Sequence, residues 1–260
     1  MADTPILELR KINKSFGAVQ VLHDIDLAVH PGEVTALVGD NGAGKSTIIK
    51  CIAGIHNVDS GEFLFEGKPV TLNSPRDAAA LGIEIVYQDL ALADNLDIVQ
   101  NMFLGRESKH RFRTLDEGAM ETQARTTLAS LSVRTVKSVR QPVSSLSGGQ
   151  RQTVAIAKAV LWNSRVVILD EPTAALGVAQ TRQVLDLVRR LADRGLGVIL
   201  ISHNMNDVIE VADRIDALYL GRIAAEVKAA DATVSQVVEL ITTGRSGDLG
   251  LSRATADANL

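Results

Sequence analysis

The chain has 260 residues, of which 46% are hydrophobic and 22% charged, so it can bury the core of one large α/β domain or two small ones. Its formal net charge of −4 excludes a global basic face for nucleic acid or anionic lipid. Its single cysteine, Cys51, excludes an internal disulfide and fits a reducing cytosol.

The first seventy residues predict β-strands. Residues 5–30 alternate in polarity, and the apolar residues of DIDLAV (24–29) would share the buried face of one strand. Residues 34–38, VTALV, form a continuous apolar run that predicts a fully buried strand. Residues 61–70, GEFLFEGKPV, predict a hairpin punctuated by glycine. We therefore expect an antiparallel β layer packed against a central sheet.

The middle of the chain differs in character. Residues 95–145 are more polar, and helical spacing runs from about 120 to 131, which predicts an α-helical insertion. The basic cluster ESKHRFR (107–113) lies within it. Because no aromatic stacking platform accompanies these charges, a solvated loop is favoured over a nucleic-acid contact.

Helical patterns alternate with strand-sized apolar runs after residue 146. The expected helices cover 148–162, 178–194 and 205–212, and the expected strands cover 166–170, 198–202 and 216–220. Such alternation predicts a mostly parallel sheet. No apolar run approaches the roughly 18 residues of a spanning helix, and the first residues lack a signal-peptide pattern. The Gly-, Ser-, Ala- and Asp-rich segment 244–260 is expected to be a flexible tail.

A glycine-rich segment between the strand at 34–38 and a following helix carries the first chemical motif. It reads GDNGAGKST and comprises Gly39, Asp40, Asn41, Gly42, Ala43, Gly44, Lys45, Ser46 and Thr47. This pattern is typical of a P-loop, whose backbone N–H groups and helix N-terminus surround phosphate oxygens. Lys45 would reach the β- and γ-phosphates, and the Ser46 hydroxyl would bind Mg²⁺. The alternative is an ordinary glycine-rich turn. The full match favours a nucleoside triphosphate site.

A second motif is the strand RVVILDEP (165–172), which ends in two carboxylates. Asp170 would hold Mg²⁺, directly or through water. Glu171 would point into the same site and polarise the water that attacks the γ-phosphate. The alternative, that either carboxylate merely caps the turn, is disfavoured once a P-loop is present.

A third motif, LSGGQ, starts the helix at 148–162. Ser147 stands where an N-cap belongs and is followed by Gly148, Gly149 and Gln150. Together the serine hydroxyl, the glycine N–H groups and the helix dipole make a second phosphate-binding surface. Because the chain has one P-loop, two surfaces for one γ-phosphate predict two copies facing head to tail.

These three motifs, in this order, resemble the ATP-binding cassette family over roughly residues 6–243. The resemblance implies a P-loop NTPase domain with a mostly parallel core sheet, an antiparallel β layer and an α-helical subdomain at about 95–160. It also implies that ATP and Mg²⁺ bind at the site and that ATP is hydrolysed. The domain would cover residues 1–243.

Three further positions match family motifs. Phe16 matches the aromatic residue that stacks on adenine, with a core phenylalanine as the alternative. Gln88 matches the glutamine that reaches Mg²⁺ and the attacking water, against a plain surface glutamine. His203 matches the histidine that contacts the γ-phosphate, against a structural histidine.

The sequences of EPTAALG (171–177) and of the stretch 87–107 resemble those of the carbohydrate-importer branch, most of all those of the single-cassette ATPases of fructose-type monosaccharide importers. That resemblance implies a peripheral subunit at the cytoplasmic face of the inner membrane. Its partners would be a second copy of itself, polytopic permease subunits and, indirectly, a periplasmic or extracellular sugar-binding protein. One position departs from the pattern, since Gly177 replaces the aspartate that usually bridges the two sites.

Other functions compete with sugar import. The main alternative function is that of a cassette of an exporter or of a non-sugar importer, and only the sequences at 87–107 and 171–177 disfavour it. A non-transport cassette acting on DNA, ribosomes or cluster assembly is disfavoured by the acidic balance and the absence of a long heptad insertion. A phosphotransferase is disfavoured by LSGGQ and the adjacent Asp170 and Glu171.

Overall fold

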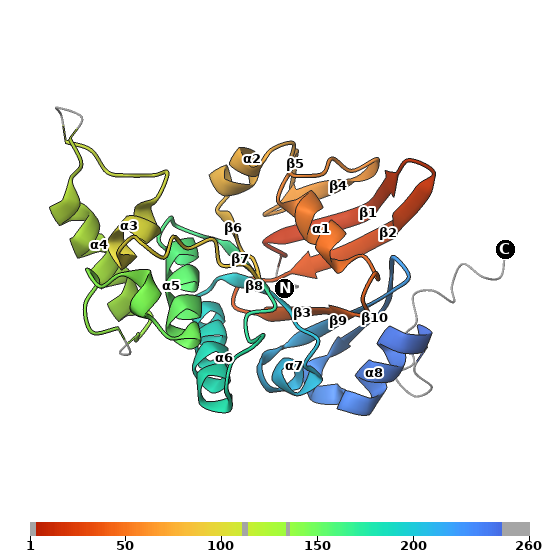
Figure 1. The fold of residues 1–260 in the computed structure, drawn as a ribbon. Helices are drawn as coiled ribbons and strands as arrows, with labels where there is room; N and C mark the ends of the chain where they lie inside the picture. The colour runs from red at the N-terminus through yellow and green to blue at the C-terminus, as the bar shows by residue number, and fades with distance from the viewer. Residues whose placement is uncertain (1–3, 111–113, 134–135, 246–260) are drawn as a thin grey trace.

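The computed structural model describes residues 4–110, 114–133 and 136–245, which form two β-sheets and several packed helices (Figure 1). The α/β class with a mostly parallel core sheet is confirmed. Most of the predicted tail, residues 246–260, and residues 111–113 of the basic cluster lie outside the described residues.

The larger sheet has six strands in the order β10-β9-β3-β8-β7-β6. These are β3 (Val34–Gly39), β6 (Ile83–Val86), β7 (Val166–Asp170), β8 (Gly197–Ile201), β9 (Arg214–Tyr219) and β10 (Arg222–Lys228). β10 runs antiparallel to β9, and all other neighbours are parallel. The continuous apolar runs of β3, β7 and β8 are buried because the sheet is covered on both faces.

The smaller sheet is antiparallel, in the order β2-β1-β4-β5. Its strands are β1 (Leu7–Phe16), β2 (Val19–Val29), β4 (Ser60–Phe65) and β5 (Lys68–Val70). Ile25, Leu27 and Val29 of β2 are buried, as the alternation predicted, and β4 and β5 form the predicted hairpin. Helix α1 (Lys45–Ile52) buries its apolar residues in one hydrophobic cluster with this layer and the core sheet.

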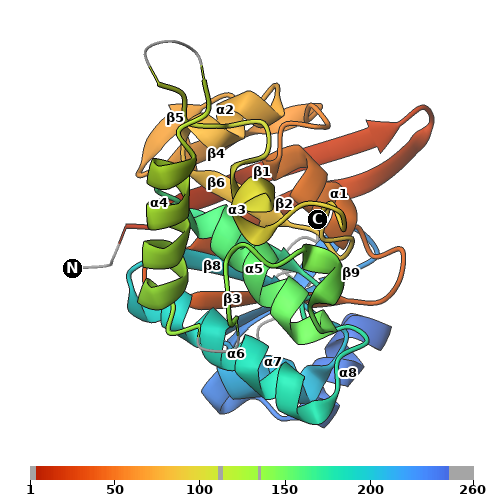
Figure 2. The ribbon, with the colours of Figure 1, turned by 60° about the vertical axis from the view of Figure 1, so that its left-hand side comes forward.

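Helices α3 (Ile98–Phe103), α4 (Glu117–Ser130), α5 (Gly148–Val160) and α6 (Val178–Asp193) gather on one side of the molecule, which Figure 2 brings forward. Their apolar faces share one cluster with β7 and β8. The buried Asn101 on α3 fixes the preceding loop, since its Oδ1 accepts from the N–H of Ala93 at 2.7 Å. Its Nδ2 also donates to three backbone carbonyls of that loop.

The remaining elements cover the other side of the larger sheet or connect strands. They are α2 (Pro75–Ala80), α7 (Met205–Val211), α8 (Val234–Thr243) and two short 3-10 helices, Val143–Ser145 and Ala229–Asp231. The sequence analysis did not predict β6, β10, α2 or α8; β6 and α2 are short, with four and six residues. Within the described part of the chain, no helix combines the length and apolar character needed to cross a bilayer.

Candidate nucleotide-binding site

The glycine-rich loop connects β3 to α1, and its backbone shape requires glycine at two positions. A Cβ on Gly39 would lie 2.5 Å from the carbonyl oxygen of Leu218 in β9. Gly44 caps α1 with a φ of +113°, a left-handed conformation that side chains rarely adopt. The loop therefore curls at the carboxyl edge of the sheet, where open α/β folds bind ligands.

Lys45 lies inside that curl. Its Nζ donates to the carbonyl oxygens of Gly39 at 2.6 Å and Asp40 at 3.0 Å. Burial lowers the pKa of Lys45, and the neighbouring carboxylates, Glu171 foremost, oppose that shift. The loop is supported from outside by Gly221, whose N–H donates to the carbonyl of Ala43 at 2.9 Å. The half-buried ammonium group of Lys45 thus lies at the centre of the loop, where it could bind an anion.

A cavity of about 380 Å³ opens between this loop and the ends of β6, β7 and β8. It brings together predicted residues from the glycine-rich loop, from the strand end at Asp170 and Glu171, and from Gln88. Those lining it are Asn41, Gly42, Gly44, Lys45, Ser46, Thr47, Gln88, Asp170 and Glu171, with Val21 and Ile201 beside them. The cavity is mainly polar and suits a highly charged ligand better than an apolar one.

Two adjacent carboxylates close one side of the cavity. Burial raises the pKa of Asp170, and the neighbouring charge of Glu171 raises it further, while Lys45 and Lys50 act in the opposite direction. Glu171 adopts a φ of +50°, and its N–H donates to the carbonyl of Ile201 in β8 at 2.9 Å. A non-glycine residue held in this conformation is typical of a site whose geometry is imposed by its surroundings.

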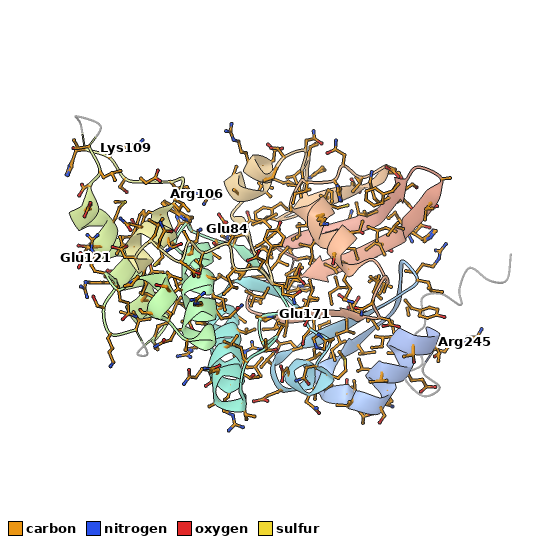
Figure 3. The ribbon with its side chains drawn as sticks, viewed as in Figure 1. Glu84, Arg106, Lys109, Glu121, Glu171 and Arg245 are labelled. Atoms are coloured by element: carbon orange, nitrogen blue, oxygen red, sulfur yellow. The ribbon has the colours of Figure 1, made fainter. Side chains whose placement is uncertain are left out.

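His203 contacts the cavity through Glu171. Its Nδ1 lies 2.6 Å from Oε2 of Glu171, and its side chain is three-quarters exposed, whereas that of Glu171 is only 16% exposed. Figure 3 labels Glu171 in the middle of the molecule, where the strands of the larger sheet end. The predicted histidine and carboxylate therefore meet, although they lie thirty-two positions apart in the sequence.

The LSGGQ residues lie apart from this cavity. Among the described residues that line it, none comes from 147–150. Ser147 is the N-cap of α5, and it forms a capping box with Gln150: its Oγ accepts from the Gln150 N–H, and its own N–H donates to the Gln150 side chain at 2.9 Å. Ser147 and Gly148 are exposed, whereas Gly149 is buried. The helix start thus faces solvent in a single copy, as a surface shared with another chain would.

Phe16 stands at the end of β1 with 44% of its surface exposed, so it is not a core phenylalanine. Its ring packs edge to face with that of His56, with centroids 5.1 Å apart. The ammonium group of Lys14 lies 5.4 Å from the ring centroid. The exposed ring remains available to a flat partner, although it is not among the residues that line the cavity.

Another hollow, of about 290 Å³, lies between β6, the segment that follows β6, the residues just after α3 and the helix α5. Arg106 forms an ion pair with Glu84 at 2.7 Å, and its guanidinium lies over the ring of Trp162. Figure 3 labels Glu84 and Arg106 next to each other. Lys158 lines the same groove, and burial lowers its pKa. Glu84, Lys158 and Trp162 match no motif, so the sequence analysis did not name them, whereas Arg106 lies in the stretch 87–107 that it singled out.

Comparison with known proteins places the chain in a family. The family model described as ABC transporter matches residues 22–174. A fructose import ATP-binding protein (FrcA) from Rhizobium meliloti is 49% identical over 248 residues, covering 93% of this chain and 95% of that protein. A xylose/arabinose import ATP-binding protein (XylG) from Sulfolobus acidocaldarius is 46% identical over 246 residues, covering 95% and 97%.

A solved structure is similar over the same extent. The crystal structure of a nucleotide-free ATP-binding cassette from an ABC transporter superposes with a TM-score of 0.80 at 27% identity, covering 91% of this chain and 98% of that one. Fold and site define a P-loop nucleotide-binding domain. The chain belongs to the ABC transporter family.

The raised pKa of Asp170 generates a prediction about stability. A carboxyl group whose pKa is raised by folding binds its proton more tightly in the folded state, so its ionisation at neutral pH destabilises the fold. We expect Asp170→Asn to raise the Tm at pH 8, with a gain that shrinks as the pH falls toward the ordinary aspartate value of 3.8. Thermal unfolding across that range measures it.

The matched control is Asp186→Asn, which changes an exposed aspartate on α6 and should leave the Tm nearly unchanged. A lower Tm for Asp170→Asn at pH 8, or a gain that does not depend on pH, would contradict the role assigned to burial.

Proposed function

We propose that this chain is the ATP-hydrolysing subunit that energises a monosaccharide importer. The observation that carries the proposal is the single cavity joining the glycine-rich loop, Gln88, Asp170 and Glu171, in a chain nearly half identical to a fructose import ATP-binding protein along almost its whole length. The relatives compared above are named as sugar import proteins, which supports import over export. No feature of the described residues favours a non-transport cassette.

The triphosphate would lie in the glycine-rich loop. Its anionic oxygens would accept from the loop N–H groups and the start of α1, and Lys45 would supply the counter-charge. The adenine would stack on the exposed ring of Phe16. The mainly polar lining and the half-buried cation support this placement.

The donors around the cavity also fit Mg²⁺. A serine hydroxyl, an aspartate carboxylate and a glutamine amide are hard oxygen ligands of the kind that this ion prefers, and Ser46, Asp170 and Gln88 line the same cavity. When bound, Mg²⁺ would neutralise phosphate charge. The carboxyl group of Asp170, whose pKa is raised by burial, would be held ionised by such a cation.

Glu171 would be the general base. In hydrolysis, a water oxygen forms a bond to the γ-phosphorus while the bond to the ADP oxygen breaks, and a carboxylate oxygen of Glu171 accepts the water proton. His203 would orient that carboxylate, since its Nδ1 lies 2.6 Å from Oε2. His203 would also contact the γ-phosphate from its exposed position.

A second copy of the chain would complete the site. The exposed start of α5 offers the Ser147 hydroxyl and glycine N–H groups but lies outside its own cavity. Head-to-tail pairing would bring it to the γ-phosphate held by the other copy, so that ATP closes the dimer and hydrolysis reopens it. Gly177, the N-cap of α6, offers no carboxylate to bridge the two sites.

Permease subunits at the membrane would receive this motion through the groove beside β6 and α5, which Arg106 and Lys158 line. The groove is lined by the neighbours of Gln88 in the chain, and Gln88 itself lines the cavity. A movement of Gln88 on nucleotide binding would therefore be transmitted to a partner bound in the groove. Together with the relatives' names, this supports a peripheral position at the cytoplasmic face of the inner membrane. A sugar-binding protein would act on the permease from the opposite side.

The transport role has a direct test. Reconstituted permease together with its sugar-loaded binding protein should raise the ATPase rate of this chain several-fold over the rate of the chain alone, because docking couples cavity closure to transport. The binding protein without sugar serves as the control. An ATPase rate that no sugar-loaded partner changes would overturn the importer assignment.

The base has its own test. Glu171→Gln keeps the size and the neutral contacts of the side chain but cannot accept the proton, so kcat should fall by roughly 100-fold or more. The affinity for ATP should be retained, and an ATP-bound dimer should accumulate on a sizing column. As a comparison, Lys45→Ala should lose tight ATP binding itself. Unchanged turnover in Glu171→Gln would remove this residue as the base.

The shared site is tested at the start of α5. Ser147→Arg places a long cation on an exposed cap, so it should block ATP-driven dimerisation while a single copy still binds ATP. Analytical ultracentrifugation with and without ATP, in the Glu171→Gln background, separates the two states. Normal dimerisation of the Ser147→Arg chain would count against a site made from two copies.

A further inference from the structure

Two loops leave the larger sheet side by side, one after β7 and one after β8. The first carries Glu171 and, two residues later, Thr173, and the second carries His203 and Asn204. They are joined near the cavity by the contact of His203 Nδ1 with Glu171 Oε2 at 2.6 Å. The N–H of Glu171 also donates to the carbonyl of Ile201 at the end of β8.

The same two loops are joined a second time through Asp207 on α7. Its Oδ2 accepts from the Thr173 hydroxyl at 2.8 Å, and its Oδ1 accepts from the Asn204 side-chain amide at 3.0 Å. Only 7% of Asp207 is exposed. Both carboxylate oxygens are therefore paired in a place where losing a partner would leave a costly unsatisfied group.

Asn204 is fixed by further bonds. Its N–H donates to the Ser202 hydroxyl at 3.0 Å, and its side-chain oxygen caps α7 by accepting from the N–H of Asn206 at 3.1 Å. The amide that reaches Asp207 is thus already oriented. Asp207 in turn holds Thr173, which belongs to the loop of the general base rather than to its own loop.

We propose that Asp207 is a positioning residue that sets the geometry of the Glu171 and His203 pair. The contacts form a closed circuit: Glu171 leads along the chain to Thr173, then by hydrogen bonds through Asp207 to Asn204, and from there to the adjacent His203 and back to Glu171. Neither Thr173 nor Asp207 lines the cavity. The inference rests on the proposed function of Glu171 as the base.

The circuit acts on turnover rather than on ATP affinity. A carboxylate that must approach one water molecule is sensitive to displacements of about 1 Å, which can lower a rate by up to about 100-fold. Apart from the contact of His203 with the γ-phosphate, the phosphate contacts would come from the glycine-rich loop before α1 and from Lys45, which the circuit does not include. Loosening the circuit should therefore separate kcat from the dissociation constant for ATP.

The test uses the full chain and four substitutions. Thr173→Val removes the hydroxyl with little change of shape and should lower kcat by about tenfold or more, with the affinity for ATP within about twofold of the wild type. Thr173→Ser restores the donor and should restore kcat. Asp207→Ala should lower kcat at least as much, and the Thr173→Val/Asp207→Ala double variant should be no slower than Asp207→Ala alone. Glu210→Ala changes an exposed residue of the same helix and should match the wild type.

Three results on kcat would overturn the inference alone: a kcat for Thr173→Val within twofold of the wild type, an equal loss in Thr173→Ser, or additive effects in the double variant. A loss of ATP affinity that accounts for the whole change in Thr173→Val would also overturn it. No ATP turnover by the wild-type chain would instead overturn the proposed function, and the inference with it. Thermal unfolding of each variant confirms that the fold is retained.

Discussion

The register of three neighbouring parallel strands places the glycine-rich loop, the Asp170 and Glu171 pair and His203 at the same edge of the larger sheet. In that register Ile201 of β8 pairs with Leu37 of β3 on one side and with Asp170 of β7 on the other. The glycine-rich loop begins two residues beyond Leu37, and the next residue after Asp170 is Glu171. His203 lies two residues beyond Ile201. Because a slip of one residue would reverse the faces of every side chain in a strand, the buried apolar residues that fix this register also fix the chemistry.

The same edge of the sheet carries two partly buried charged groups, Lys45 and Asp170, whose burial opposes folding. Burial pulls the pKa of Lys45 down and that of Asp170 up, so each would be easier to bury neutral than charged. The positive φ of Glu171 adds conformational strain beside them. Sites that bind charged ligands commonly show such features, because favourable interactions with the bound ligand offset the free-energy cost of buried charge and backbone strain.

Much of this arrangement could be predicted from local patterns. Continuous apolar runs identified β3, β7 and β8, and the loops that follow them carry motifs with a defined spacing. The cavity brings together most of the residues that those motifs named. The position of Ser147 outside the cavity of its own chain agrees with the expectation that a second surface would come from another copy, which remains a proposal.

What the sequence did not predict depends on contacts between distant segments. Strand β6 has only four residues, too few for a clear period. Asn101 and Asp207 are polar residues on otherwise ordinary helices, and only their buried hydrogen bonds distinguish them. The groove beside Trp162 combines β6 and α5 with residues of the stretch 87–107, so that stretch alone could indicate only part of it.

Trp162 is the only tryptophan of the chain, and it lies at that groove between the ring of Phe103 and the guanidinium of Arg106. All tryptophan fluorescence of the protein therefore comes from this groove, which is separate from the cavity at the glycine-rich loop. A partner that displaced Arg106 would change the polarity around the indole, and the emission spectrum would shift with it. The chain thus carries an intrinsic fluorescent reporter at the groove that Arg106 and Lys158 line.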